Sequence, residues 1–247
     1  MSRREAKGPV TGPKTVALVP AAGRGLRMGG HIPKQFLLLG GLPILAHSLR
    51  ALQDSPVIHE IILAVPEAER RNCLDRIVSP GHFTKVTKVV SGGEQRQDSV
   101  RHALAEVDAE TEFVLVHDAV RPFLTQAMIR EVVAAAQQHG GAIIALPMRD
   151  TVKHVGQGHI IERTVDRRPL WLAQTPQAFR KDWLDEGHRK AQLEGIHATD
   201  DAHLVELIGK TVVVVEGSGE NIKVTRPEDL SIGEAILQRR ASARSKG

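Results

Sequence analysis

Residues 15–28 are TVALVPAAGRGLRM, an apolar run followed by a loop of small residues and arginines. The run is typical of a buried β-strand, because β-branched and aliphatic residues dominate it and no charge interrupts it. Similar runs recur along the chain, separated by stretches with helical spacing. The strand-like runs are Thr15–Pro20, Glu60–Val65, Lys85–Val90, Glu112–Val116, Ala142–Pro147 and Thr211–Val215. The helical stretches are 43–53, 66–77, 95–107, 125–138, 180–194 and 227–240.

This alternation predicts a Rossmann-like α/β fold, a mostly parallel sheet with helices on both faces. Several of the runs are continuous in Val, Ile and Leu, as expected of strands that helices cover on both sides. In open sheets of this kind, ligands bind beyond the carboxyl ends of the strands. The unusual loops of this sequence follow predicted strands, so we expect the functional site at that edge.

The segment 149–168, RDTVKHVGQGHIIERTVDRR, breaks the alternation because it is polar and favours β-structure. It bends around Gly156 and Gly158, which predicts a β-hairpin that protrudes from the sheet. An isolated hairpin with few apolar residues is unstable. Two arrangements would stabilise it: packing against its own domain, or acting as an arm that clasps a second subunit.

The composition is that of a globular protein, with 247 residues, 41% hydrophobic and 25% charged. It predicts one domain over 15–238, flanked by disordered basic ends at 1–14 and 239–247. Cys73 is the only cysteine, which excludes an intrachain disulfide and a cysteine-built zinc site and favours a reducing compartment. The sequence shows neither a membrane-length apolar run nor a secretory signal, so we expect a cytoplasmic protein without membrane contact.

The net charge of +4 does not indicate a nucleic-acid partner. The two ends, 1–14 and 239–247, together carry eight basic residues and one acidic residue, so the body between them is mildly acidic. Binding to nucleic acid requires a basic patch on the folded part. We therefore expect no nucleic-acid partner.

The loop after the first strand has the character of a phosphate-binding loop. Its small residues allow backbone N–H groups to approach phosphate oxygens, and Arg27 and Lys34 add two cations. It is not the dinucleotide fingerprint, because Met28 stands where the third glycine belongs, and the chain contains no Walker A motif. The alternative for the glycines alone is a plain tight turn.

The loops after the third and fourth strands add further candidates. Residues 91–99 are SGGEQRQDS at the start of a helix, whose N–H groups could face a nucleotide, although Ser91 and Glu94 also match a capping box. Asp118 follows the fourth strand and is a candidate Mg²⁺ ligand, because Mg²⁺ favours one or two carboxylates plus phosphate oxygens. Arg121 could bind a phosphate of a second substrate. The alternative is an Asp–Arg pair on the surface.

These motifs resemble a known family. PAAGRGLRM followed by PKQ looks like the signature loop of sugar-phosphate nucleotidyltransferases. The ordered set SGGEQRQDSV, HDAVRP, RDTVK, TVDRRPLWLAQTPQAF, TDDAHLVE and NIKVTRPEDL resembles the 2-C-methyl-D-erythritol 4-phosphate cytidylyltransferase family, over Thr15 to Leu237. The ribitol-5-phosphate cytidylyltransferase family shares HDAVRPF, QTPQ and NIKVT, but usually opens with LAGG and lacks the TVDR and TDDA blocks.

The resemblance implies Mg²⁺-dependent transfer of CMP from CTP to a sugar-alcohol phosphate, in a homodimer held by the 149–168 arm. The implied nucleotide-binding residues are Pro20, Ala21, Ala22, Gly23, Gly25, Gly92, Gly93, Arg96 and Ser99. The implied catalytic residues are Arg27, Lys34, Arg167 and Lys223. The implied substrate-binding residues are Asp118, which is also the metal ligand, Ala119, Arg121, Thr151, Arg167 and Lys223, with Thr151 and Arg167 contributed by the partner's arm. Two positions depart from the family, Leu26 where Arg is common and Val120 where Ala is frequent.

Two other functions stay open at this point. A ribitol-5-phosphate cytidylyltransferase would use the same chemistry on another acceptor. A catalytically inactive nucleotide-sensing protein would keep the fold without turnover, because fold alone does not determine function.

Overall fold

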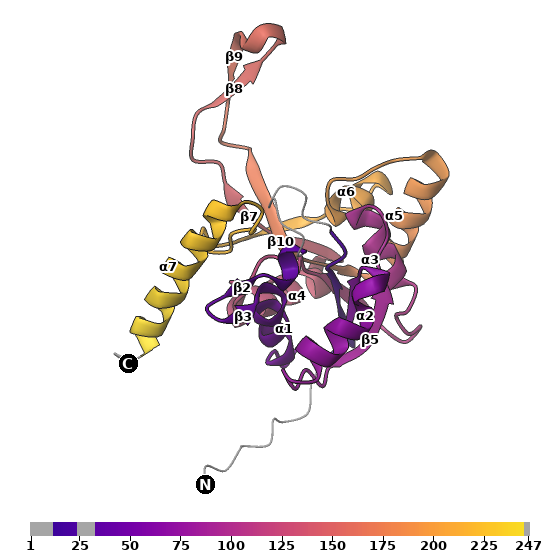
Figure 1. Ribbon diagram of the computed structural model, residues 1–247. Coiled ribbons are helices and arrows are strands. Elements are labelled where there is room, and N and C mark those ends of the chain that lie inside the picture. Colours follow the sequence, from indigo (N-terminus) through magenta and orange to yellow (C-terminus); the bar gives the residue numbers. More distant parts are fainter. Residues whose placement is uncertain (1–11, 24–32, 245–247) are drawn as a thin grey trace.

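The computed structural model describes residues 12–23 and 33–244. Its centre is a seven-stranded sheet with the order β11-β7-β10-β6-β1-β4-β5 (Figure 1). The strands are β1 (Thr15–Pro20), β4 (Glu60–Val65), β5 (Val86–Ser91), β6 (Phe113–Val116), β7 (Gly141–Pro147), β10 (Trp171–Arg180) and β11 (Val213–Glu216). All six predicted strands belong to this sheet, and their neighbouring pairs are parallel. The predicted α/β fold with a mostly parallel sheet is confirmed.

Strand β10 is the member of the sheet that the sequence pattern does not predict. It runs antiparallel to both of its neighbours, β6 and β7. Its middle is Gln174-Thr175-Pro176-Gln177, and the register with β7 shifts between Ala173 and Gln177. A proline cannot donate to the ladder, and the polar residues around it interrupt the apolar run. The consequence is a polar segment in the middle of the sheet, beside the end of β6.

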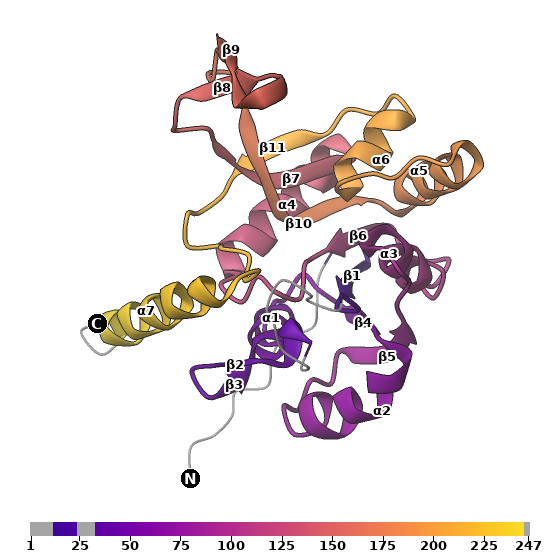
Figure 2. The same cartoon turned by 45° about the horizontal axis from the view of Figure 1, so that its top comes forward.

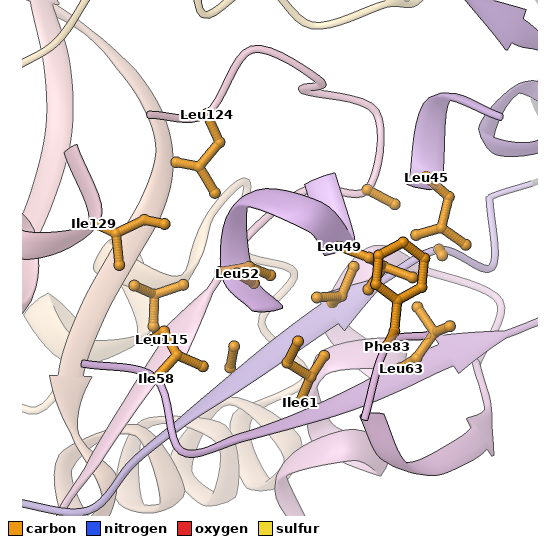
Figure 3. Close-up of a cluster of buried hydrophobic side chains, with 14 of the residues drawn as sticks. Leu45, Leu49, Leu52, Ile58, Ile61, Leu63, Phe83, Leu115, Leu124 and Ile129 are labelled. Atoms are coloured by element: carbon orange, nitrogen blue, oxygen red, sulfur yellow. The ribbon is translucent and has the colours of Figure 1, made fainter. Parts of the chain in front are cut away.

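Helices cover both faces of the sheet (Figure 2). The first face carries α1 (Ile44–Gln53), η3 (Glu67–Glu69), α2 (Arg70–Cys73), η4 (Leu74–Val78) and α4 (Gln126–His139), and the second carries α3 (Arg96–Leu104), α5 (Lys181–Glu194) and α6 (Asp201–Leu207). Successive strand side chains point to opposite faces, so Ala17 and Val19 join the first core, while Val16 and Leu18 join the second. Figure 3 shows the first core, where Leu49 of α1 lies among side chains from the neighbouring strands.

A smaller apolar cluster fixes helix α7 (Pro227–Arg244) against the body. Ile236 of α7 packs with Phe123 and with Leu39 of β2 (Leu38–Leu39), which forms a short hairpin with β3 (Leu42–Pro43). The 3-10 helix η2 (Lys34–Phe36) precedes this hairpin. The cluster also contains Val224, so it holds the segment between β11 and α7 beside the end of β6.

The structure describes residues 12–14 and 239–244 of the two ends that the sequence predicts to be disordered. The prediction of a disordered tail over 239–247 is wrong for 239–244, because α7 continues to Arg244 and both Arg239 and Arg240 form ion pairs with Glu220. The prediction for 1–14 is wrong at Lys14, whose Nζ lies 2.9 Å from Asp108 Oδ2. Residues 1–11 and 245–247 lie outside the described residues.

The predicted hairpin is present and projects from the sheet (Figures 1 and 2). Its strands are β8 (Val152–Val155) and β9 (Ile161–Val165), joined by the 3-10 turn η5 (Gln157–His159). Val152 is the register partner of Val165. Large apolar side chains on it are exposed, Ile160 by 68% and Ile161 by 59%. In the described ranges, no helix is both long and apolar enough to cross a membrane.

Candidate active site

A cleft lies at the carboxyl ends of β1, β5 and β6, the edge where the sequence predicts the site. Its volume within the described part of the chain is about 120 Å³. It is lined by Pro20, Ala21, Ala22, Gly23, Lys34, Gln35, Gly93, Glu94, Gln95, Arg96, Ser99, Asp118, Ala119, Val120 and Lys223. Most of the residues predicted to bind nucleotide therefore share one cleft with Lys34, Asp118 and Lys223.

Two loops of small residues form one wall of the cleft by direct contact. A Cβ placed on Gly92 would lie 2.1 Å from the Cβ of Ala22 and 2.9 Å from Ser99 Oγ, so only glycine fits there. The Ser99 hydroxyl accepts the N–H of Gly93 at 3.1 Å. The side-chain amide of Gln35 donates to Ala21 O at 2.6 Å, and this bond holds the backbone of the loop that follows β1. Polypeptide backbone is thereby presented to the cleft.

The N-terminus of α3 points into the same cleft. The helix begins at Arg96 with Gln95 as its N-cap, and Asp98 accepts the N–H of Gln95 at 3.3 Å to complete a capping box. The alternative cap of Ser91 and Glu94 is therefore wrong in register, because β5 continues through Ser91. The Ser91 hydroxyl bonds to Glu67 instead.

Asp118 lies on the floor of the cleft and is 5% exposed. Arg96 Nε lies 2.7 Å from its Oδ1, and Lys223 Nζ lies 2.7 Å from its Oδ2. Burial alone would raise the pKa of Asp118, but the charges of Arg96 and Lys223 outweigh this effect and hold the pKa well below its usual range. The carboxylate is therefore ionised at any pH at which the protein works.

Polar groups from β10 hold the loop that carries Asp118. The Asp118 N–H donates to Thr175 Oγ1 at 3.0 Å. The buried ring of His117 has Nε2 3.1 Å from Arg121 O and Nδ1 3.2 Å from Thr175 Oγ1. A carbonyl oxygen can only accept, so Nε2 carries the proton and Nδ1 accepts from the Thr175 hydroxyl. His117 is thus a neutral structural residue below the cleft.

Arg121 faces Asp118 but is fixed by another contact. Its Nε lies 4.0 Å from Asp118 Oδ2, and its Nη1 donates to Asn221 O at 2.7 Å. The side chain of Arg121 is 12% exposed and that of Asp118 7%, so the alternative of an Asp–Arg pair on the surface is wrong. Burial lowers the pKa of Arg121, an effect that the charge of Asp118 opposes.

Some predicted site residues lie elsewhere. Thr151 and Arg167 belong to the arm and are absent from the described lining of the cleft in their own chain. The guanidinium of Arg167 donates to Arg149 O at the base of the arm. Gly25 and Arg27 fall outside the described residues.

The chain matches the family model described as 2-C-methyl-D-erythritol 4-phosphate cytidylyltransferase over residues 15–239. The chain belongs to this family. It is similar to the family's protein from Syntrophus aciditrophicus, with 47% identity over 92% of this chain and 97% of the relative. The protein of the same name from Bacillus cytotoxicus is 48% identical over 89% of this chain and 96% of the relative.

Solved structures of the cytidylyltransferase family share the fold. The crystal structure of the Thermus thermophilus enzyme superposes with a TM-score of 0.76 at 34% identity, covering 91% of this chain and 99% of that one. The crystal structure of 4-diphosphocytidyl-2C-methyl-D-erythritol synthase from Anaerococcus prevotii has a TM-score of 0.80 at 29% identity, covering 92% of this chain and 99% of that one.

A metal ion could be held in the cleft of this cytidylyltransferase family member by Asp118. Mg²⁺ is commonly bound by one or two carboxylates, with phosphate oxygens and water completing the shell. The described residues contain no group of three His, Cys, Asp or Glu that could form a protein-only metal site. The ionised carboxylate of Asp118 at the floor of the cleft therefore fits a metal ion that is shared with the phosphate oxygens of a substrate, and does not fit a metal site built from protein ligands alone.

The sequence does not predict three polar residues that shape this family member's site. Asp201 is 1% exposed and its Oδ2 accepts from Arg96 at 2.8 Å. Thr175 holds Asp118, and the side-chain amide of Asn221 donates to Thr175 O at 2.9 Å. The signal that could have found them is a polar residue among apolar neighbours, in the blocks QTPQ, TDDA and NIKVT.

Proposed function

We propose that this chain transfers CMP from CTP to 2-C-methyl-D-erythritol 4-phosphate, giving 4-diphosphocytidyl-2-C-methyl-D-erythritol and pyrophosphate, on the methylerythritol phosphate route to isoprenoid precursors. The observation that carries the proposal is the cleft in which two glycine-containing loops face the cations Lys34 and Lys223 across the ionised Asp118. Membership of the cytidylyltransferase family supports the identity of both substrates.

The wall of small residues suits the nucleotide. Backbone groups of 20–23 and of Gly92 and Gly93, with the hydroxyl of Ser99 and the side chain of Arg96 nearby, would bind cytidine and its phosphates. The N-terminus of α3, which opens on the cleft, favours anions through the positive end of the helix dipole.

The reaction is an in-line displacement at phosphorus. An oxygen of the methylerythritol phosphate forms a bond to the α-phosphorus of CTP, the bond from that phosphorus to the bridging oxygen of the β-phosphate breaks, and pyrophosphate leaves. A phosphate monoester is already anionic near neutral pH, so the attacking oxygen requires no general base. This agrees with the neutral, inward-facing His117.

Catalysis then consists of positioning and of neutralising charge. Lys34 and Arg27 would stabilise the charge that develops on the α-phosphate oxygens. Lys223, whose Nζ contacts Asp118, would hold the acceptor phosphate together with Arg121 and Ala119. Mg²⁺, held by Asp118 and phosphate oxygens, would supply further neutralisation when bound.

A homodimer would complete the substrate site. Thr151 and Arg167 lie on the arm, away from the described lining of their own cleft, and would contact the acceptor in the partner's cleft. The exposed apolar side chains Ile160 and Ile161 would be covered in such a dimer. We further propose that the protein acts in the cytoplasm, where its one cysteine stays reduced.

The test is release of pyrophosphate from CTP and Mg²⁺ with 2-C-methyl-D-erythritol 4-phosphate, with ribitol 5-phosphate, and with CTP alone. We expect release with the first acceptor, and a loss of about 10²–10³-fold in the matched Lys34→Ala variant. Release with ribitol 5-phosphate only would assign the chain to the other acceptor. Silence with both acceptors, in a protein that still binds CTP, would favour the nucleotide-sensing alternative.

A further inference from the structure

Arg96 joins two buried carboxylates that come from distant parts of the chain. Its Nε lies 2.7 Å from Asp118 Oδ1 at the end of β6, and its Nη2 lies 2.8 Å from Asp201 Oδ2 at the start of α6. Asp118 belongs to the site described above, whereas Asp201 does not line the described part of the cleft. The side chain of Asp201 is 1% exposed, so a charge has been buried behind the site. Such a burial is costly unless the charge is paired.

The carboxylate of Asp201 does not cap the helix that carries it. An acidic residue in the first turn often serves as a cap, but Asp200 is the N-cap of α6 and accepts the N–H of His203 at 3.1 Å. Asp201 Oδ2 accepts from Arg96, and its Oδ1 has no hydrogen-bond partner among the described residues. Among the described residues, Arg96 is therefore the hydrogen-bond partner of the Asp201 carboxylate.

The backbone of Asp201 is fixed to the same strand that fixes Asp118. The Asp201 N–H donates to Oε1 of Gln177, a side chain of β10 that is 1% exposed. Two residues earlier in β10, Thr175 accepts the N–H of Asp118 at 3.0 Å. One strand thus sets the positions of both carboxylates, and the Arg96 guanidinium spans the space between them.

We propose that Asp201 is a positioning residue, which holds the Arg96 guanidinium in the orientation that places its Nε on Asp118. Arginine has a long flexible stem and a rigid planar head, so its orientation depends on the partners of that head. With Asp201 removed, the head can rotate about its stem or leave Asp118 for the cleft. In each case the contact between Arg96 Nε and Asp118 loses its fixed geometry.

The direct test is exchange of the Arg96 Nε hydrogen with solvent, followed by NMR on the whole protein. In Asp201→Asn we expect exchange to accelerate at least about tenfold, because a hydrogen bond between charged groups is lost. The control is Asp185→Asn, which removes a carboxylate that pairs with Lys181 at 2.7 Å on the adjacent helix α5. Unchanged exchange in Asp201→Asn would overturn the proposal, and so would equal acceleration in the control.

The activity test rests on the proposed function and asks whether Asp201 acts through Arg96. Asp201→Asn should lower kcat/KM for pyrophosphate release by roughly 10–100-fold, as loss of an outer-shell partner does. In an Arg96→Gln background the same substitution should lower it less than about threefold, since the group it positions is gone. Asp201→Glu, which keeps the charge, should recover part of the activity.

The outcomes separate the two proposals. Equal losses in both backgrounds, or losses that merely follow the folded fraction measured by thermal unfolding, would show that Asp201 only stabilises the fold. If the unmodified protein releases no pyrophosphate, the proposed function fails, while the exchange measurement still decides the role of Asp201.

Discussion

Lys223 Nζ lies 2.7 Å from Asp118 Oδ2, although Asp118 lies in the loop after the central strand β6 and Lys223 lies in the segment between β11 and α7. The contact joins the loop after β6 to the segment after β11 at the cleft. Arg96 Nε also lies 2.7 Å from Asp118 Oδ1, so the Asp118 carboxylate forms ion pairs with two cations. Removal of one cation therefore leaves the carboxylate paired, and should separate catalysis from folding.

Lys223→Met should lower kcat/KM by roughly 10²–10³-fold, because a preorganised cation is lost where charge must be neutralised. The folded state should persist, since Arg96 still pairs with Asp118. Steady-state kinetics and circular dichroism measure the two effects. Lys223→Arg, which keeps the charge, is the matched control and should retain more activity. Normal turnover of the Lys223→Met enzyme would show that Lys223 has no role in the reaction.

Gly92→Ala should disrupt the nucleotide wall, because its Cβ would lie 2.1 Å from the Cβ of Ala22. Overpacking of this kind costs about 1–3 kcal/mol of stability, and here displacement of the loop should also weaken CTP binding. Calorimetric titration with CTP and thermal unfolding provide the measurements. At Gly219 a Cβ would meet nothing within 4 Å, so Gly219→Ala is the control and should bind CTP normally. Equal affinities of the two variants for CTP would contradict the prediction that Gly92 must stay small for the nucleotide to bind.

Subunit mixing tests whether the arm completes the site of a partner. Arg167→Ala and Lys34→Ala should each lose most of the activity when tested alone, by about 10²–10³-fold. After random exchange of subunits, about half of the dimers are mixed and each mixed dimer contains one site with both residues intact, so activity should reappear at up to about a quarter of that of the unmodified protein. Exchange is verified independently with two labelled subunits. No recovery despite exchange would place Arg167 in the site of its own chain.

His117 should make the protein less stable in mild acid. Burial lowers the pKa of its ring to about 4, whereas the pKa in an unfolded chain is about 6.5. Between these values the unfolded state binds the extra proton, so stability is full above pH 6.5 and decreases as the pH falls towards 4. The difference between the two pKa values corresponds to about 3 kcal/mol of the free energy of unfolding.

Urea unfolding at several pH values measures this dependence. His117→Gln should flatten it in that window, although a part should remain because burial also lowers the pKa of His188. Replacement of the exposed His197 by Gln serves as the control and should leave the dependence intact. Identical profiles for His117→Gln and the unmodified protein would contradict the assignment.

Cys73 should be inert in the folded protein. Its side chain is 1% exposed, and burial raises the pKa of the thiol to about 12, so almost no thiolate forms at pH 8. A chromogenic disulfide reagent should react only at the rate at which the protein opens, and rapidly in denaturant. Rapid labelling under native conditions would show that α2 leaves the sheet readily.

The sequence predicts those parts of the fold that have their own local signal. β1 and β4 have the predicted bounds, because residues 16–20 and 61–65 are unbroken apolar runs. β10 lacks such a run, since Pro176 and its polar neighbours occupy its middle. The tail at 239–244 continues α7, and its residues Arg239 and Arg240 form ion pairs with Glu220 that sequence spacing does not reveal.

The same distinction applies to the site. Asp118 and the glycines of 91–99 are predicted, because strand ends and loop composition mark them locally. Lys223, taken alone, would be predicted as a solvated charge, yet its Nζ contacts Asp118. Arg96 and Asp201 are 105 residues apart in the sequence, so only the folded chain shows that they meet.

The two ends of the arm lie side by side. Pro147, the last residue of β7, is the register partner of Trp171, the first residue of β10, and Met148 N donates to Leu170 O at 2.9 Å. The arm is therefore a removable insertion in a long hairpin, and a tight turn could replace it without altering the sheet. An altered arm would therefore leave the sheet and the cleft of its own chain intact, and would change only the contacts that the arm makes with a partner.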